Sequence, residues 1–214
     1  MIHKIFSCLA MTGALAGTVA GAATVDVVVT DSSGRPAANA VVSLVTEGSA
    51  SAIASHAPEK SIVDQRHETF LPLVVVVRKG GEVVFTNNDV TMHQVYSFSP
   101  IKQFQFEIDK GHVSKPVVFD KSGVVAIGCN IHDNMVVYVD VADAPFAVVS
   151  DASGHAEIRD VPDGRYLADV WHPQMRVGRK PVPSALTVSG DQAKLILSVP
   201  LMEMPAMKMH KSDY

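Results

Sequence analysis

Polar and apolar residues alternate with a period of two along most of the chain, which is typical of β-strands that bury one face. The turn signal Asp31-Ser-Ser-Gly34 lies between two such segments, 24–30 and 40–46. We therefore expect these two segments to form a hairpin. No segment shows the 3.6-residue period of a long amphipathic helix. Short strands with regular turn signals therefore predict an all-β chain of the sandwich class. The expected strands span residues 24–30, 40–46, 73–77, 82–87, 93–98, 104–108, 117–119, 124–128, 136–141, 146–150, 156–159, 165–171 and 195–199.

The beginning of the sequence has a different pattern. Lys4 precedes a small and apolar stretch, 5–20, which is shorter than a typical membrane span. The sequence Ala20-Gly21-Ala22 is a small-x-small cleavage site, and Ala23 is an alternative last residue of the leader. We therefore expect 1–22 to be a secretory signal peptide and the mature protein to be periplasmic.

The composition excludes some classes of partner. The 214 residues include 18 basic and 22 acidic side chains, a formal net charge of −4 at pH 7. The absence of a basic block disfavours nucleic acid as a partner, and no later apolar run is long enough for stable membrane insertion. The length permits one large domain or two small ones.

One short segment carries the candidate chemistry. Because Cys8 would leave with the leader, Cys129 would be the only thiol of an exported protein, where cysteines usually pair. Cys129, His132 and Met135 follow at intervals of three residues, so a tight turn would direct all three to one metal ion. Soft sulfur together with imidazole suits copper in both oxidation states. His93, which begins an expected strand after a polar turn, is the best candidate for a fourth ligand; the alternative for Cys129 is a small core residue.

The outer parts of the chain resemble one known domain. The sequences 24–47 and 146–200 are similar to the carboxypeptidase-regulatory-like domain, a transthyretin-like β-sandwich, in their D-x-x-G turns and the V-P-D-G-R-Y corner. We therefore predict that 24–56 and 146–200 form one discontinuous sandwich, and that 60–142 is a second domain inserted into it. Three modules in a row are the alternative, but a lone hairpin cannot bury a core.

The middle part, 60–142, resembles the cupredoxins, the family that includes plastocyanin, pseudoazurin and amicyanin. The similar features are Gln65 with Phe70-Leu-Pro72, Lys79-Gly80-Gly81 before Glu82-Val-Val-Phe85, Asn87-Asn88-Asp89 ahead of His93, and the C-x2-H-x2-M loop. The loop spacing is that of amicyanin, and the combination with the flanks resembles bacterial methylamine utilisation proteins. The resemblance implies a Greek-key β-sandwich that binds one copper ion through His93, Cys129, His132 and Met135.

Two residues depart from the cupredoxin pattern. Gln94 follows His93 where the family usually has Asn, and Asn130 follows Cys129 where Ser or Thr is usual. In the family these positions tie the two ligand loops together and donate to the thiolate. Their replacement therefore bears on the redox potential and the spectrum, because hydrogen bonds to the ligands tune a metal site.

Other histidines and methionines are weaker candidates. His67 and His112 lie in the same predicted domain as the ligands, His172 ends a strand of the outer sandwich, and His56 lies in the expected linker. We expect His172 to be structural or part of an interface, and His56 to be solvated. The tail, 201–214, would either load Cu(I) through its thioethers or carry incidental methionines. Its candidate ligands are Met202, Met204, Met207, Met209 and His210.

These features predict a periplasmic protein that carries single electrons between transiently bound redox partners by means of one copper ion. The alternatives are a copper-binding or copper-delivery protein, and a scaffold module with a structural metal whose regulatory-like domain contacts carbohydrate or protein. We do not expect an enzyme, because the predicted copper ligands all come from the protein and leave no open position. No Ser/His/Asp arrangement, carboxylate pair or phosphate-binding loop is recognisable either.

Overall fold

The computed structural model describes residues 22–48, 56–176, 178 and 181–202. The prediction of an all-β chain is confirmed, because the described residues form sixteen strands and no helix. Accordingly, the described part of the chain contains no helix that is long and apolar enough to cross a membrane. The predicted leader lies outside the described residues apart from Ala22, and the predicted Met-rich tail lies outside them apart from Leu201 and Met202.

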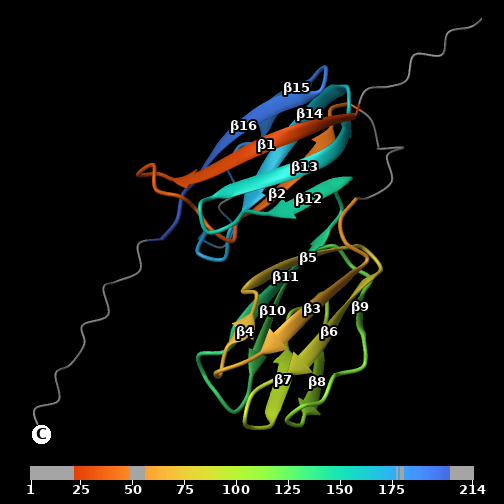
Figure 1. The fold of residues 1–214 in the computed structure, drawn as a ribbon, viewed down its shortest axis with the longest axis vertical. Coiled ribbons are helices and arrows are strands. Elements are labelled where there is room, and N and C mark those ends of the chain that lie inside the picture. Colours follow the sequence, from red (N-terminus) through yellow and green to blue (C-terminus); the bar gives the residue numbers. More distant parts are fainter. Residues whose placement is uncertain (1–21, 49–55, 177, 179–180, 203–214) are drawn as a thin grey trace, which may run out of the picture.

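Strands from the two ends of the chain build one β-sandwich (Figure 1, upper part). One sheet has the order β13-β1-β16 and the other has the order β12-β2-β14-β15. Valines of β1 alternate inward and pack on Leu44, Phe146 and Tyr166 of the facing sheet. The strand bounds are β1 Ala22–Asp31, β2 Val41–Thr46, β12 Phe146–Val149, β13 His155–Pro162, β14 Gly164–Trp171, β15 Ser184–Val188 and β16 Gln192–Val199.

The predicted hairpin between the first two strands is wrong. β1 pairs with β13 and, in parallel, with β16, whereas β2 pairs with β12 and β14 in the opposite sheet. The turn at Asp31 exists, with Gly34 at a φ of 83°, but the chain then crosses from one sheet to the other. The physical reason is burial, because the crossing lets the apolar faces of both strands meet in one core, which a two-stranded hairpin cannot provide.

The middle of the chain forms a second β-sandwich (Figure 1, lower part). A five-stranded sheet of order β5-β11-β10-β7-β8 faces a four-stranded sheet of order β4-β3-β6-β9. Phe70, Phe85, Phe119 and Ile127 fill the space between the two sheets. The strand bounds are β3 Lys60–Gln65, β4 Phe70–Leu71, β5 Val74–Arg78, β6 Gly81–Asn87, β7 His93–Ser97, β8 Phe104–Ile108, β9 Val117–Phe119, β10 Gly123–Cys129 and β11 Val136–Ala142.

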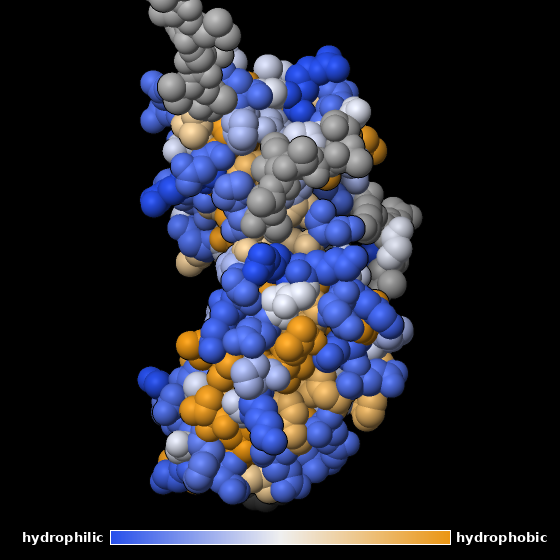
Figure 2. All heavy atoms as spheres, turned by 90° about the vertical axis from the view of Figure 1, so that its right-hand side faces the viewer, coloured by the Kyte–Doolittle hydropathy of each residue, from blue (hydrophilic) through white to orange (hydrophobic). Residues whose placement is uncertain are grey.

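The two sandwiches share a small apolar interface. β5 is buried on both faces: Val75 and Val77 face their own core, whereas Val74 and Val76 pack toward the other sandwich. The rings of Tyr138, on β11, and Trp171, on β14, lie 5.7 Å apart at this interface. Figure 2 shows that the molecular surface narrows between the two sandwiches. The continuous run of valines in β5 therefore reflects a strand that is covered on both sides.

Candidate metal centre

Three potential metal ligands converge at one end of the second sandwich. Nδ1 of His93 lies 3.7 Å from Sγ of Cys129 and 3.3 Å from Nδ1 of His132. One ligand atom from each residue lies within 4.8 Å of the other two, and this is the only such group of His, Cys, Asp or Glu among the described residues. His93 thus forms one site with two residues that lie 36 and 39 positions further along the sequence.

Sheet topology explains this convergence. His93 begins β7 and Cys129 ends β10, and these two antiparallel neighbours place Cys129 opposite Val95. Because the two strands are antiparallel, the beginning of β7 and the end of β10 lie at the same end of the sheet. His132 lies in the loop to β11, where the N–H of Met135 donates to the carbonyl of His132 at 3.1 Å and closes the turn.

The candidate ligands differ in their exposure to solvent. The side chain of His93 is fully buried, and Cys129 is 4% exposed. The side chain of His132 is 20% exposed, so it is the edge of the cluster that reaches the surface. Met135 is buried in the core cluster that also contains Cys129, next to the closing turn of the loop.

The donor set fits a soft or borderline transition metal. An ion that lies about 2.0–2.1 Å from nitrogen and about 2.3 Å from sulfur can bridge donor atoms up to about 4 Å apart. The separations of 3.3 and 3.7 Å are within that reach. Two imidazoles and a thiol, with no carboxylate among them, suit copper or zinc better than magnesium or calcium.

Two carboxylates contact the far sides of the imidazoles. Oδ2 of Asp89 lies 3.2 Å from Nε2 of His93, and Oε1 of Glu68 lies 3.6 Å from Nε2 of His132. The N–H of Glu68, followed by that of Val90, lowers the pKa of Asp89 to about 2, so this carboxylate is ionised at neutral pH. In the sequence, the one signal for Asp89 is its place in the Asn87-Asn88-Asp89 motif, four positions before His93. Glu68 is distant in sequence from all three residues of the cluster, so no local pattern predicts its contact with His132.

The polar turn before β7 is held rigidly by Asn87, which is 1% exposed. Its side-chain amide donates to the carbonyls of Thr91 and Ile108 at 2.8 and 2.9 Å, and its Oδ1 accepts the N–H of Asp89 at 2.9 Å. Because both ends of the turn are bonded to one buried amide, His93 enters β7 in a fixed orientation.

The other candidate histidines lie outside the cluster. They are His56, His67, His112 and His172. His172 is buried, its Nε2 lies 2.8 Å from the carbonyl of Ala38, and its Nδ1 accepts the N–H of Gln174. Burial lowers the pKa of His172, which favours a neutral side chain that joins two loops of the first sandwich. His56 is exposed and stacks on Phe146, with ring centroids 4.6 Å apart.

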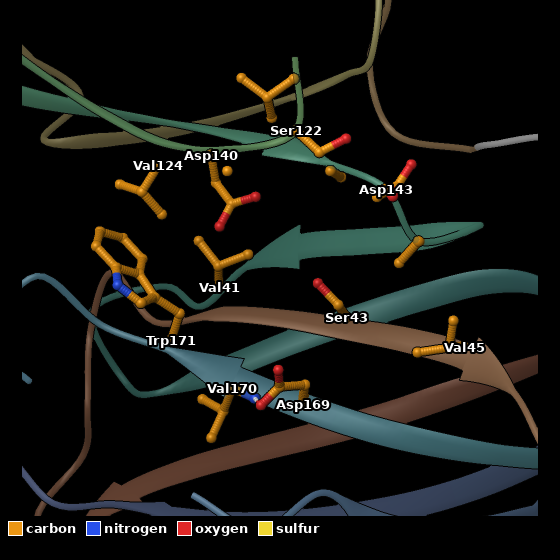
Figure 3. Close-up of a pocket in the computed structure, with 14 residues that line it drawn as sticks. Val41, Ser43, Val45, Ser122, Val124, Asp140, Asp143, Asp169, Val170 and Trp171 are labelled. Carbon is orange, nitrogen blue, oxygen red and sulfur yellow. Dashed lines mark hydrogen bonds between the residues drawn. The ribbon is translucent and has the colours of Figure 1, made fainter. Parts of the chain in front are cut away.

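A separate cleft of about 590 Å³ lies between the two sandwiches. Figure 3 shows the Trp171 ring beside Val124 at one end of the cleft and Val45 at the other. Three of its lining residues, Asp140, Asp143 and Asp169, carry carboxylates. The cleft shares no residue with the metal centre, so the two features are distinct.

No protein-family model matches this chain, and no curated protein matches its sequence.

Among solved structures it is similar to a Cu-containing nitrite reductase (NirK) from Thermus scotoductus SA-01, with 22% identity and a TM-score of 0.37 over 39% of this chain and 22% of that one. It is also similar to a purple cupredoxin from Nitrosopumilus maritimus, with 22% identity and a TM-score of 0.35 over 38% of this chain and 99% of that one. Amicyanin from Paracoccus versutus shares 21% identity, with a TM-score of 0.35 over 46% of this chain and 91% of that one. The chain therefore spans less than a quarter of the length of the nitrite reductase.

Proposed function

We propose that this protein is an exported copper protein that carries single electrons between redox partners. His93, Cys129, His132 and Met135 would hold one copper ion. The observation that supports this most strongly is the convergence of two imidazole Nδ1 atoms and a buried thiol at distances that one metal ion can bridge. The buried thioether of Met135 at the end of the same loop is the candidate for a weak axial ligand.

The surroundings of these ligands suit electron transfer. Bound copper would supply a one-electron couple between Cu(I) and Cu(II). His93 and Cys129 are buried at strand ends, so their positions need to change little with oxidation state, and water is kept away from them. This rigidity favours rapid electron exchange. We also infer that the protein is not an enzyme, because a thioether in the fourth position would leave no place for a substrate.

The partly exposed His132 is the proposed point of electron exchange. Three apolar side chains within three positions of a proposed ligand are exposed to solvent: Val90 is 76%, Met92 37% and Ile131 47% exposed. Exposed apolar side chains around a polar ligand edge suit a small and transient docking surface. We infer that the partners are redox proteins that approach this end of the second sandwich.

Export to the periplasm follows from the leader, which the sequence predicts to end at Ala22 or Ala23. Ala23 is fully buried and lies opposite Val161 in β13. Cleavage after Ala22 would leave this buried residue in the mature strand, so we favour that site.

Copper loading tests the proposed function. Mature protein beginning at Ala23 would be mixed with Cu(II), and its visible absorption and electron paramagnetic resonance recorded. We expect an intense thiolate-to-copper band that bleaches on reduction and returns on oxidation. Cys129→Ser should lose the band, whereas the control His112→Gln, which changes an exposed histidine outside the cluster, should keep it.

Two results would contradict the proposal. If Cys129→Ser binds copper as tightly as the wild type, the site is assigned wrongly. A colourless protein that takes up only Cu(I) would instead indicate copper delivery.

A further inference from the structure

Both imidazoles of the cluster present the same ring nitrogen to the site, although the two ring planes are inclined by 61°. His93 and His132 direct Nδ1 toward the centre of the site, and each turns Nε2 toward a carboxylate, Asp89 or Glu68. A neutral imidazole carries one N–H and one lone pair. A carboxylate beside Nε2 retains the proton there and leaves the Nδ1 lone pair free for a metal ion.

One oxygen of the Asp89 carboxylate contacts both the backbone of Glu68 and the imidazole of His93. Oδ2 of Asp89 accepts the backbone N–H of Glu68 at 2.7 Å and also lies 3.2 Å from Nε2 of His93. Oδ1 of the same carboxylate accepts the N–H of Val90 at 2.8 Å. The carboxylate therefore ties the turn after β3 to the loop that carries the buried ligand.

The turn that carries Glu68 is itself constrained. Backbone hydrogen bonds of 3.0 and 3.1 Å join Arg66 and Thr69 in both directions, and Glu68 has a φ of 54°. A non-glycine residue in the left-handed region needs support from its surroundings. The bond to Asp89 provides such support, and the carboxylate of Glu68 is thereby held near Nε2 of His132.

We propose that Asp89 and Glu68 are positioning residues that fix both histidines as the Nε2–H tautomer and favour Cu(II) over Cu(I) at the site. The inference rests on the proposed function and adds residues that set its redox potential. A negative charge against the far nitrogen makes an imidazole a stronger donor, which stabilises the more highly charged ion. The side chain of Asp89 is only 5% exposed and that of Glu68 is 63% exposed, so solvent screens the effect of Glu68 more strongly.

The test compares the reduction potentials of copper-loaded wild type, Asp89→Asn, Glu68→Gln and the control Asp133→Asn. Asp133 is an exposed carboxylate directly after His132, so the control removes the same charge from the ligand loop. In Asp89→Asn we expect the ratio of Cu(II) to Cu(I) affinity to fall about tenfold, in the range usual for groups that support metal ligands. For a one-electron couple that fall is a rise in potential of about 59 mV. Glu68→Gln should also raise the potential, but by less than Asp89→Asn does. The control Asp133→Asn should give the smallest rise of the three variants.

A second readout does not need copper. ¹⁵N nuclear magnetic resonance of the metal-free protein reports which ring nitrogen of His93 and His132 carries the proton, and we expect Nε2 in both. This measurement also decides the case in which Asp89→Asn does not fold. A failed copper titration of the wild type would count against the proposed function, whereas the tautomers would still test the present inference.

Three results would overturn the inference. The first is an Nδ1–H tautomer at His93 in the wild type. The second is a folded Asp89→Asn variant with an unchanged potential. The third is a shift in Asp133→Asn as large as that in Glu68→Gln, because net charge alone would then explain the effect.

Discussion

The side-chain amide of Asn130 donates a hydrogen bond of 2.6 Å to the side-chain oxygen of Gln94. These residues directly follow the proposed ligands Cys129 and His93, and the backbone N–H of Asn130 also donates to the carbonyl of Gln94 at 2.9 Å. At both positions the sequence departs from the usual cupredoxin residues. The pair nevertheless ties the two ligand segments together, so the departures compensate each other in space.

This pair can be tested with a double-mutant cycle on Gln94→Ala and Asn130→Ala. Each single variant should lower the free energy of unfolding by about 0.5–1.5 kcal/mol, the usual net value of one hydrogen bond. The double variant should lose less than the sum, because both changes remove the same bond. Urea denaturation of the metal-free protein measures the coupling, and strictly additive losses would show that the bond contributes nothing.

Gly128 gives a second prediction, since it lies immediately before Cys129 and opposite Tyr96. A Cβ at this position would lie 3.0 Å from the Tyr96 ring, closer than ordinary van der Waals contact. We expect Gly128→Ala to lower the free energy of unfolding by about 1–3 kcal/mol, as overpacking usually does. The same change in a Tyr96→Leu background, where the ring is absent, should be less costly. An equal loss in both backgrounds would contradict a steric cause.

The acidic turns predict the pH dependence of stability. The hydroxyl of Ser33 and the neighbouring N–H groups lower the pKa of Asp31, and Ser153 acts in the same way on Asp151. Because these pKa values are lower in the folded state, the unfolded chain binds more protons on acidification. The stabilisation is therefore complete above about pH 4, the ordinary pKa of Asp, and is lost as the pH falls below it.

Urea midpoints measured from pH 7 to pH 2.5 should show this loss in the wild type. Asp31→Asn should flatten the curve by removing one titrating group, and Ser33→Ala should flatten it partly by removing the largest cause of the shift. An Asp31→Asn curve parallel to that of the wild type would rule out this carboxylate as a source of the pH dependence.

Trp171 is the only tryptophan of the chain and lies at the interface between the sandwiches. Trp171→Ala should lower the free energy of unfolding by about 1–3 kcal/mol, because it removes both apolar contact and the ring contact with Tyr138. It should also separate the unfolding transitions of the two sandwiches in calorimetry. The control Trp171→Phe keeps an aromatic ring and should lose less. Identical losses in both variants would argue against the ring contact.

Metal binding should stabilise the second sandwich selectively, since all the proposed ligands belong to it. At a free copper concentration of about 100 times the dissociation constant, linkage predicts about 2.7 kcal/mol of stabilisation. Calorimetry with and without copper measures the change, and a chelator should reverse it. Cys129→Ser should show little stabilisation; a full effect in this variant would place the copper elsewhere.

The strands that the sequence did not predict have identifiable features. β3 is polar at most positions, and only Val63 and Gln65 are buried, so it lacks a clear alternation. β4 has two residues, and β15 is a short strand of five. Each of these strands forms by hydrogen bonding to a neighbour: β3 pairs with β6, β4 with β3, and β15 with β14. The pairing depends on the neighbouring strand, so the sequence of the segment alone does not predict it.

By itself, the sequence determined the all-β character and the chemistry of the candidate ligands. Alternation of apolar residues is a local property, and so is the spacing of Cys129, His132 and Met135 within one loop. The tertiary structure decided which strands share a sheet, why β5 is apolar on both faces, and that Asp89 and Glu68 contact the two imidazoles. These contacts join residues that are distant in sequence, and they form only when burial of the apolar faces brings the separate segments together.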